Sequence, residues 1–138
     1  MGVNIQTLAR ESIIQESTSV RNLTNYINED FDNIVRLIYN SNGRVVITGF
    51  GRSANIAEKT GRILNSTSTP AIPMHAANAI HSDLEIIQKE DTIFCISISG
   101  STPGKEVLMP LLKYRKNELA INAFNTMEDQ YYPVVCNE

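Results

Sequence analysis

The chain has 138 residues, of which 42% are hydrophobic and 20% are charged, proportions ordinary for one domain with a buried core. Its net charge is −3 and it has no run of lysines or arginines, which argues against binding nucleic acid or an anionic membrane through a broad basic face. No apolar stretch approaches the roughly 20 residues that a membrane-spanning helix needs.

The first 42 residues are predicted to form a helical arm. Apolar residues recur at roughly helical spacing up to position 27, and the segment 28–30 marks a break. A shorter helix follows and ends at "NSNG", because asparagine and glycine favour helix ends. The apolar positions that define the longer helix are Ile5, Leu8, Ile13, Val20, Leu23 and Ile27.

From Arg44 onward, strand-like and helical patterns alternate. The runs at 45–48 and 93–96 are continuously apolar, which is typical of central strands covered on both faces. Strands that alternate with helices indicate right-handed crossovers and parallel pairing. We therefore predict a three-layer α/β sandwich with a five-stranded parallel sheet in the common order 2-1-3-4-5. The predicted strands are 44–51, 70–75, 91–99, 118–124 and 132–138, the helices are 53–67 and 103–117, and a loop with a short helix covers 76–87.

Two of these strands end in loops that suit an anion. "GFGRS" at 49–53 follows the first strand and "SISGST" at 97–102 follows the third, and both lead into helices, whose N-termini attract negative charge. In the predicted order the loops meet at a topological switch point, where open α/β sheets bind ligands. Ser101 or Thr102 could instead cap the helix that begins near Pro103. One hydroxyl suffices for a cap, so four hydroxyls within six positions favour a phosphate site.

Two nucleotide-binding motifs are incomplete in this chain. "GFGRSA" has Ala54 at the sixth position of G-x-G-x-x-G, and no acidic residue follows the second strand to bind a ribose hydroxyl. "GSTPGKE" lacks the Gly-Lys-Ser/Thr ending of a P-loop. A nucleotide-binding domain is therefore a third alternative, and it predicts stabilisation by nucleotides and not by sugar phosphates.

A resemblance to known proteins is carried by "GRVVITGFGRSANIAEKTGRILNSTSTPAIPMHAANAIHSDLEII" and "DTIFCISISGST". These segments resemble the sugar isomerase (SIS) domain family, and most closely its arabinose 5-phosphate isomerase type. The resemblance implies a single SIS domain over 1–138, with the arm at 1–42 and a flavodoxin-like core at 43–138. It also implies reversible aldose–ketose isomerisation between arabinose 5-phosphate and ribulose 5-phosphate through an enediolate, without a cofactor or metal.

The resemblance further implies roles for single residues. His81 is the candidate base, and Arg52 is the candidate cation, because arginine stays protonated and holds oxyanions as a fixed fork. Asp83 is a candidate partner for the His81 imidazole or else a local cap, and His75 is expected to be structural. The predicted phosphate-binding residues are Gly51, Ser53, Ser97, Ser99, Gly100, Ser101 and Thr102.

Several positions depart from the family pattern. Arg52 stands where the family type has Lys, and Asn78 stands where it has Glu. Gly104 occupies the place of a catalytic Glu, and Glu106 lies two positions on, about 200° around a helix. The family's C-terminal helices, which carry a further catalytic His, do not follow in the printed sequence. These departures motivate a second hypothesis, a non-catalytic phosphosugar-binding sensor or regulatory module.

We expect a state of assembly from the same resemblance, and a cellular compartment from the cysteines. Family members form dimers or tetramers, so we expect a homodimer or homotetramer that uses the amphipathic arm and binds a phosphorylated sugar. Cys95 and Cys136 fall on strands separated by the fourth strand, roughly 10 Å apart, which is too far for a disulfide. With no cysteine framework or signal peptide, we expect reduced thiols and a cytoplasmic location.

Overall fold

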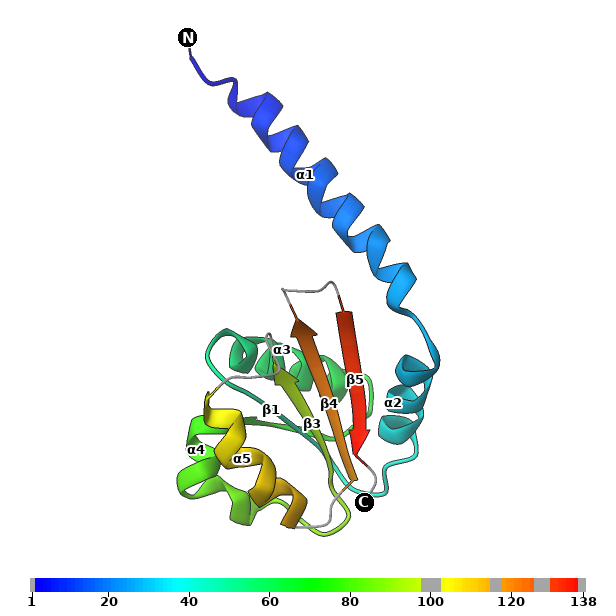
Figure 1. Cartoon of the computed structure of the whole chain (residues 1–138), viewed down its shortest axis with the longest axis vertical. Coiled ribbons are helices and arrows are strands. Elements are labelled where there is room, and N and C mark those ends of the chain that lie inside the picture. The colour runs from blue at the N-terminus through cyan, green and yellow to red at the C-terminus, as the bar shows by residue number, and fades with distance from the viewer. Residues whose placement is uncertain (1, 98–102, 115–117, 126–129, 137–138) are drawn as a thin grey trace.

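A computed structural model describes the backbone of residues 2–97, 103–114, 118–125 and 130–136, and the side chains of residues 2–97 and 107–112. One sheet forms the middle layer, with the strand order β2-β1-β3-β4-β5 (Figure 1). The first four strands in this order pair in parallel, which confirms the α/β class with a parallel sheet. The strands are β1 (Val45–Gly49), β2 (Ala71–His75), β3 (Thr92–Ser97), β4 (Glu118–Asn125) and β5 (Gln130–Cys136).

The last strand corrects the prediction of an all-parallel sheet, because β5 pairs antiparallel with β4. Only the positions 126–129 separate the two strands. A parallel pair needs a crossover of roughly a dozen residues or more, whereas an antiparallel pair needs only a short connection. The connection is therefore too short for the predicted direction.

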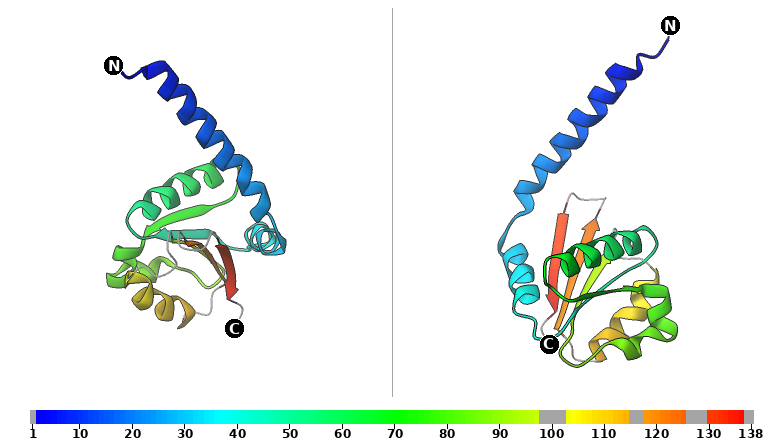
Figure 2. Two further views of the ribbon diagram at one scale, coloured as in Figure 1. Left: turned by 45° about the horizontal axis from the view of Figure 1, so that its top comes forward. Right: turned by 180° about the vertical axis from the view of Figure 1, so that it is seen from behind.

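Helices cover both faces of the sheet (Figure 2). On one face, Val45 and Ile47 of β1 pack with Ala57 of α3 and with Ile38 of α2. On the other face, residues of β1, β2 and β3 pack with α4 and α5 in a second cluster that contains Leu108 and Leu112. Burial on both faces explains the continuous apolar runs of the central strands. These helices are α2 (Glu29–Tyr39), α3 (Arg52–Ser66), α4 (Ala76–His81) and α5 (Pro103–Tyr114), and a 3₁₀ turn, η2 (Asp83–Ile86), follows α4.

A buried ion pair joins the amino ends of β1 and β3. The Asp91 carboxylate accepts hydrogen bonds from the Arg44 side chain at 2.6 and 3.1 Å, from the Arg44 backbone amide at 2.9 Å and from the Gln88 amide at 2.8 Å. Arg44 also donates to the Ile86 carbonyl at 2.8 Å. The Asp91 side chain is only 1% exposed, so these contacts replace the water that the charge would otherwise bind. They fix the sheet at the end away from the loops that follow β1 and β3.

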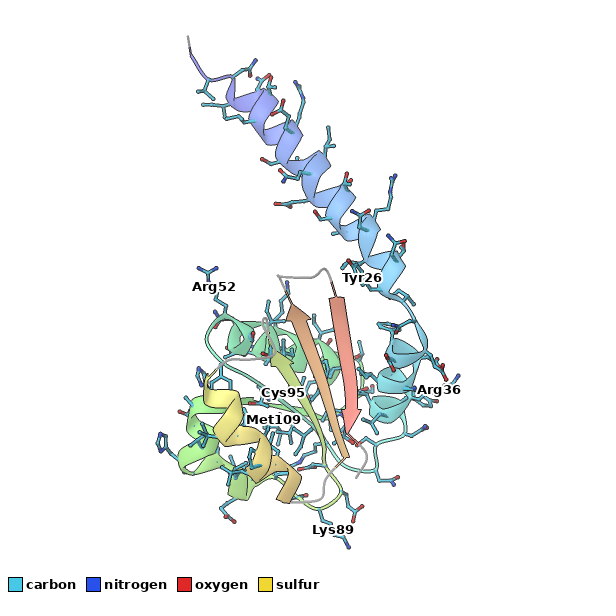
Figure 3. All side chains as sticks on the ribbon, viewed as in Figure 1. Tyr26, Arg36, Arg52, Lys89, Cys95 and Met109 are labelled. Atoms are coloured by element: carbon cyan, nitrogen blue, oxygen red, sulfur yellow. The ribbon has the colours of Figure 1, made fainter. Side chains whose placement is uncertain are left out.

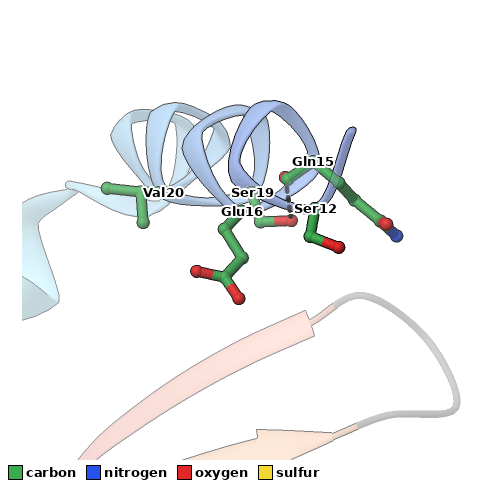
Figure 4. A pocket seen from close by; sticks show the side chains of 5 residues that line it. All are labelled: Ser12, Gln15, Glu16, Ser19 and Val20. Carbon is green, nitrogen blue, oxygen red and sulfur yellow. Dashed lines mark hydrogen bonds between the residues drawn. The ribbon is translucent and has the colours of Figure 1, made fainter. Parts of the chain in front are cut away.

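The N-terminal arm extends away from the sheet in every view (Figures 1 and 2). Its helix α1 (Ile5–Asn22) has no buried residue, and the Asn4 side chain caps it by accepting from the Thr7 amide at 3.2 Å. The helix ends earlier than predicted, since residues 23–26 form the 3₁₀ turn η1 (Leu23–Tyr26). Asn28, predicted as part of a break, instead caps α2 by accepting from the Phe31 amide. One side of α1 borders an open hollow of about 500 Å³ (Figure 4). The residues that line it are Ser12, Gln15, Glu16, Ser19 and Val20.

Among the residues that the structure describes, no helix is both long and apolar enough to cross a membrane.

Candidate functional site

The carboxyl ends of three neighbouring strands lie at one level of the sheet. Gly49, at the end of β1, is in register with His75 of β2 on one side and Ile96 of β3 on the other. The helices that follow β1 and β3 cover opposite faces, because α3 packs in one core cluster and α5 in the other. This arrangement is the topological switch point that the sequence predicts for the ligand.

The first loop is a tight turn that requires glycine at two positions. Gly51 has a φ of +54°, a conformation that side chains rarely adopt, and it forms the N-cap of α3. A Cβ at Gly49 would lie 2.8 Å from the backbone carbon and oxygen of Ser53. The Ser53 amide donates to the Phe50 carbonyl at 3.0 Å, and the Ala54 amide donates to the Gly51 carbonyl at 3.1 Å. The strand end and the first turn of α3 are therefore in direct contact.

Two predicted site residues begin α3 and differ in exposure. Ser53 is 3% exposed, so it lies at the base of the loop. Arg52 is exposed and reaches outward from the start of the helix (Figure 3). Arg36, Arg44 and Arg62 each pair with a carboxylate, whereas Arg52 forms no ion pair with any residue that the structure describes. A cation beside the positive end of a helix is unfavourable unless an anion joins it.

The second loop is described only at its two ends. Ser97 is the last residue of β3 and is 5% exposed. Pro103 begins α5, as the sequence predicts. The predicted phosphate-binding residues Ser99, Gly100, Ser101 and Thr102 lie outside the described residues.

The candidate base comes from the element that follows β2. His81 is exposed and is the last residue of α4, about 9 Å along the helix axis from the end of β2. His75 caps this helix, because its Nδ1 accepts from the Ala77 amide at 3.2 Å, which agrees with its expected structural role. Asp83 accepts from the Ser82 hydroxyl at 3.1 Å and makes no hydrogen bond to His81. Asp83 therefore contacts its neighbour Ser82, and its side chain makes neither of the two expected contacts among the described residues.

The described residues offer no group of three His, Cys, Asp or Glu side chains placed to hold a metal ion. Cys95 forms no disulfide within the described part of the chain; it is 1% exposed and lies in the core cluster beneath α5 (Figure 3). Cys136 lies at the end of β5, in register with Leu119 of β4, so β4 separates the two cysteines as predicted.

Comparison with known proteins identifies the family. The SIS domain model matches residues 37–122, which is more than half of the chain. The chain belongs to the SIS domain family. This result confirms the resemblance carried by the loop motifs.

Curated relatives and solved structures agree with this assignment. Arabinose 5-phosphate isomerase KdsD of Yersinia pestis is 36% identical over 83% of this chain and 35% of its own length. KdsD of Pseudomonas aeruginosa is 37% identical over 76% of this chain and 32% of its own length. The structure of E. coli CFT073 c3406 in complex with arabinose 5-phosphate is 29% identical, with a TM-score of 0.80 over 88% of this chain and 66% of that one. The chain spans about a third of the length of these curated relatives.

Proposed function

We propose that this SIS domain binds a phosphorylated sugar and isomerises it between aldose and ketose forms, with arabinose 5-phosphate and ribulose 5-phosphate as the pair. The observation that carries the proposal is the similarity to the c3406 structure in complex with arabinose 5-phosphate, which extends over 88% of this chain. The relatives named arabinose 5-phosphate isomerase support the same ligand. We propose a cytoplasmic location with this function, as the cysteine content of the sequence predicts.

The phosphate is assigned to the two loops at the ends of β1 and β3. The N-terminus of α3 supplies a partial positive charge beside Gly51 and Ser53. Arg52, unpaired among the described residues, adds a full positive charge at the same helix end, where a bound anion would relieve its repulsion from the helix dipole. The serine-rich loop contributes hydroxyl donors from Ser97, Ser99, Ser101 and Thr102, with Gly100 allowing close approach.

The proposed chemistry is a proton transfer between neighbouring sugar carbons. His81 takes the C2 proton of the aldose, and the electron pair of that C–H bond forms the C1–C2 double bond as the C1 carbonyl oxygen becomes the oxyanion of an enediolate. Arg52 stabilises the oxyanion, since guanidinium donors hold a fixed fork toward it. Transfer of the C2 hydroxyl proton to O1 and return of the proton from His81 to C1 give the ketose. Atoms and electrons balance without a redox partner.

One observation favours the second candidate, a non-catalytic phosphosugar-binding module. Helix α5 begins at Pro103, so Gly104 lies in its first turn, where the family resemblance implies a catalytic Glu. Glu106 is two residues further on, about 200° around the helix from that position. This candidate keeps the phosphate loops and their ligand but predicts no turnover.

Calorimetric titration of the chain with arabinose 5-phosphate, arabinose and ATP tests the ligand class. We expect arabinose 5-phosphate to bind, arabinose to bind far more weakly because it lacks the phosphate, and ATP not to compete. Binding of ATP without binding of arabinose 5-phosphate would replace the proposal with the nucleotide-binding alternative.

Arg52→Met is expected to weaken the binding of arabinose 5-phosphate about tenfold, the size of one charge-assisted hydrogen bond. The urea unfolding midpoint of the free chain should stay at its wild-type value or rise slightly, since Arg52 is exposed, is unpaired among the described residues and places a positive charge at the helix N-terminus. Arg62→Met, on the same helix, is the matched control, because Arg62 pairs with Glu58 on the exposed face. Equal affinity of the two variants would remove Arg52 from the site.

We further propose that 1–138 is one SIS domain that assembles as a homodimer or homotetramer through α1. Exposed apolar side chains on this helix and its flanks motivate this proposal: Val3, Ile5, Leu8, Ile13, Ile14, Val20, Leu23 and Ile27.

Ile13→Glu is expected to shift the chain to monomer in sedimentation velocity, because Ile13 is 67% exposed in the single chain. Ser17→Glu adds the same charge to α1 as a control. A monomeric wild type would contradict the assembly surface.

A further inference from the structure

Thr48, near the carboxyl end of β1, carries a fully buried hydroxyl. The residue is 0% exposed, and its Oγ1 has no hydrogen-bond partner in the part of the chain that the structure describes. A buried polar group without a partner is unfavourable for stability, and such groups are rare in folded proteins. Valine has nearly the same shape and would fill this site without that penalty.

The position of Thr48 connects this hydroxyl to the candidate site. Thr48 is the last residue but one of β1, in register with Met74 of β2 and Cys95 of β3. Side chains alternate along a strand, so Thr48 lies on the same face as Val46, which packs in the cluster beneath α4 and α5. Ser97 lies two residues after Cys95 on the same face of β3. The unpaired hydroxyl is thus directly below the level at which β1 and β3 end.

Thr92 is a second buried threonine, and its hydroxyl has a structural hydrogen bond. Thr92 begins β3, at the opposite end of the sheet, and is 2% exposed. Its Oγ1 donates to the Ser41 hydroxyl at 3.0 Å. Both threonines are buried on a strand. Thr92 lies at the amino end of the sheet with a paired hydroxyl, whereas Thr48 lies near the carboxyl end and has no partner among the described residues.

We propose that Thr48 is a positioning residue of the phosphosugar site, an inference that rests on the proposed function. Its hydroxyl forms a hydrogen bond with the main chain beside the carboxyl end of β1 when the sugar phosphate binds. Thr48 is fully buried and does not touch the ligand. The hydroxyl therefore contributes to affinity for the sugar phosphate and not to the stability of the free chain. A buried polar group without a partner is expected mainly at functional sites, where binding and not stability requires it.

The test compares Thr48→Val, Thr48→Ser and Thr92→Val for their urea unfolding midpoints and, by calorimetry, for their affinity for arabinose 5-phosphate. Thr48→Val should keep or raise the midpoint and weaken binding about tenfold, the effect of one lost hydrogen bond. Thr48→Ser keeps the hydroxyl and should bind like the wild type. Thr92→Val should lower the midpoint, because it leaves Ser41 without this partner, and should not change the affinity.

Two outcomes overturn the proposal while the wild type binds arabinose 5-phosphate. One is equal affinity of Thr48→Val and the wild type, which removes the hydroxyl from the site. The other is a fall of the midpoint in Thr48→Val as large as that in Thr92→Val, which means that the hydroxyl is already paired in the free chain. A wild type that does not bind arabinose 5-phosphate overturns the proposed function itself, and the assignment of Thr48 falls with it.

Discussion

Asp91→Ala is expected to lower the free energy of unfolding by about 3 kcal/mol, because it breaks a buried ion pair by removing one partner. The change removes the acceptor for the Arg44 guanidinium and for the backbone amides of Arg44 and Gln88. The loss is expected at the lower end of what breaking a buried ion pair costs, because the Arg44 side chain is 28% exposed and can regain water. Urea unfolding followed by circular dichroism at neutral pH measures the loss.

Asp32→Ala is the matched control for this prediction. Asp32 also pairs with an arginine at 2.6 Å, through Arg36, but both side chains are more than half exposed. An exposed pair of this kind contributes little to stability. If the two variants lose the same stability, the ion pair of Arg44 and Asp91 does not hold the amino ends of β1 and β3 together.

The stability that the Asp91 carboxylate contributes is expected to fall as the pH is lowered. Burial acts to raise the pKa of Asp91, but the hydrogen bonds from Arg44 and the backbone amides outweigh it, so this pKa lies below its ordinary value of 3.8. A lowered folded-state pKa contributes stability above the unfolded-state pKa, and this contribution is lost as the pH falls through the folded-state value. The stability difference between wild type and Asp91→Asn should therefore be constant near neutral pH and should shrink below about pH 4.

Gly49→Ala is expected to lower the free energy of unfolding by about 2 kcal/mol and to abolish measurable binding of arabinose 5-phosphate. The new Cβ would lie 2.8 Å from backbone atoms of Ser53, which cannot move aside as a flexible side chain could. The first turn of α3 must shift, and with it Gly51, Arg52 and the helix N-terminus to which we assign the phosphate. Urea unfolding and calorimetry measure the two effects on the same sample.

Gly61→Ala, within the same helix, provides the comparison. A Cβ at Gly61 meets only the Pro73 side chain, at 3.3 Å, and alanine favours the helix over glycine. We expect a change in stability of less than about 1 kcal/mol and unchanged affinity. Normal binding of arabinose 5-phosphate by Gly49→Ala would show that the ligand lies away from this loop.

The core of the sheet is predictable from the sequence because its signal is local. The apolar runs of β1 and β3 are long enough to mark strands covered on both faces, and glycines mark the loop where β1 meets α3. The predicted direction of β5 is wrong, although the signal is present in the four positions between Asn125 and Gln130. Strand-like composition is the same in either direction, and only the length of the connection separates the two pairings.

The candidate site is also predictable from the sequence only in part. Gly51 and Arg52 follow from the loop motif, and the structure places both at the start of α3. The burial of Ser53 and the pairing of Asp83 with Ser82 depend on tertiary packing and on a side-chain rotamer, which the sequence does not encode at a single position. Thr48 is not predicted as a site residue because threonine favours strands, so a lone hydroxyl in "RVVITG" is ordinary strand composition.

The most direct test of the central claim is NMR of arabinose 5-phosphate incubated with the chain in deuterated water. The isomerase predicts deuterium at C2 of arabinose 5-phosphate and the appearance of ribulose 5-phosphate, both reduced in His81→Gln. Binding without exchange at high protein concentration would contradict the isomerase and favour the binding module. Arabinose 5-phosphate that neither exchanges nor binds would contradict the phosphosugar site itself.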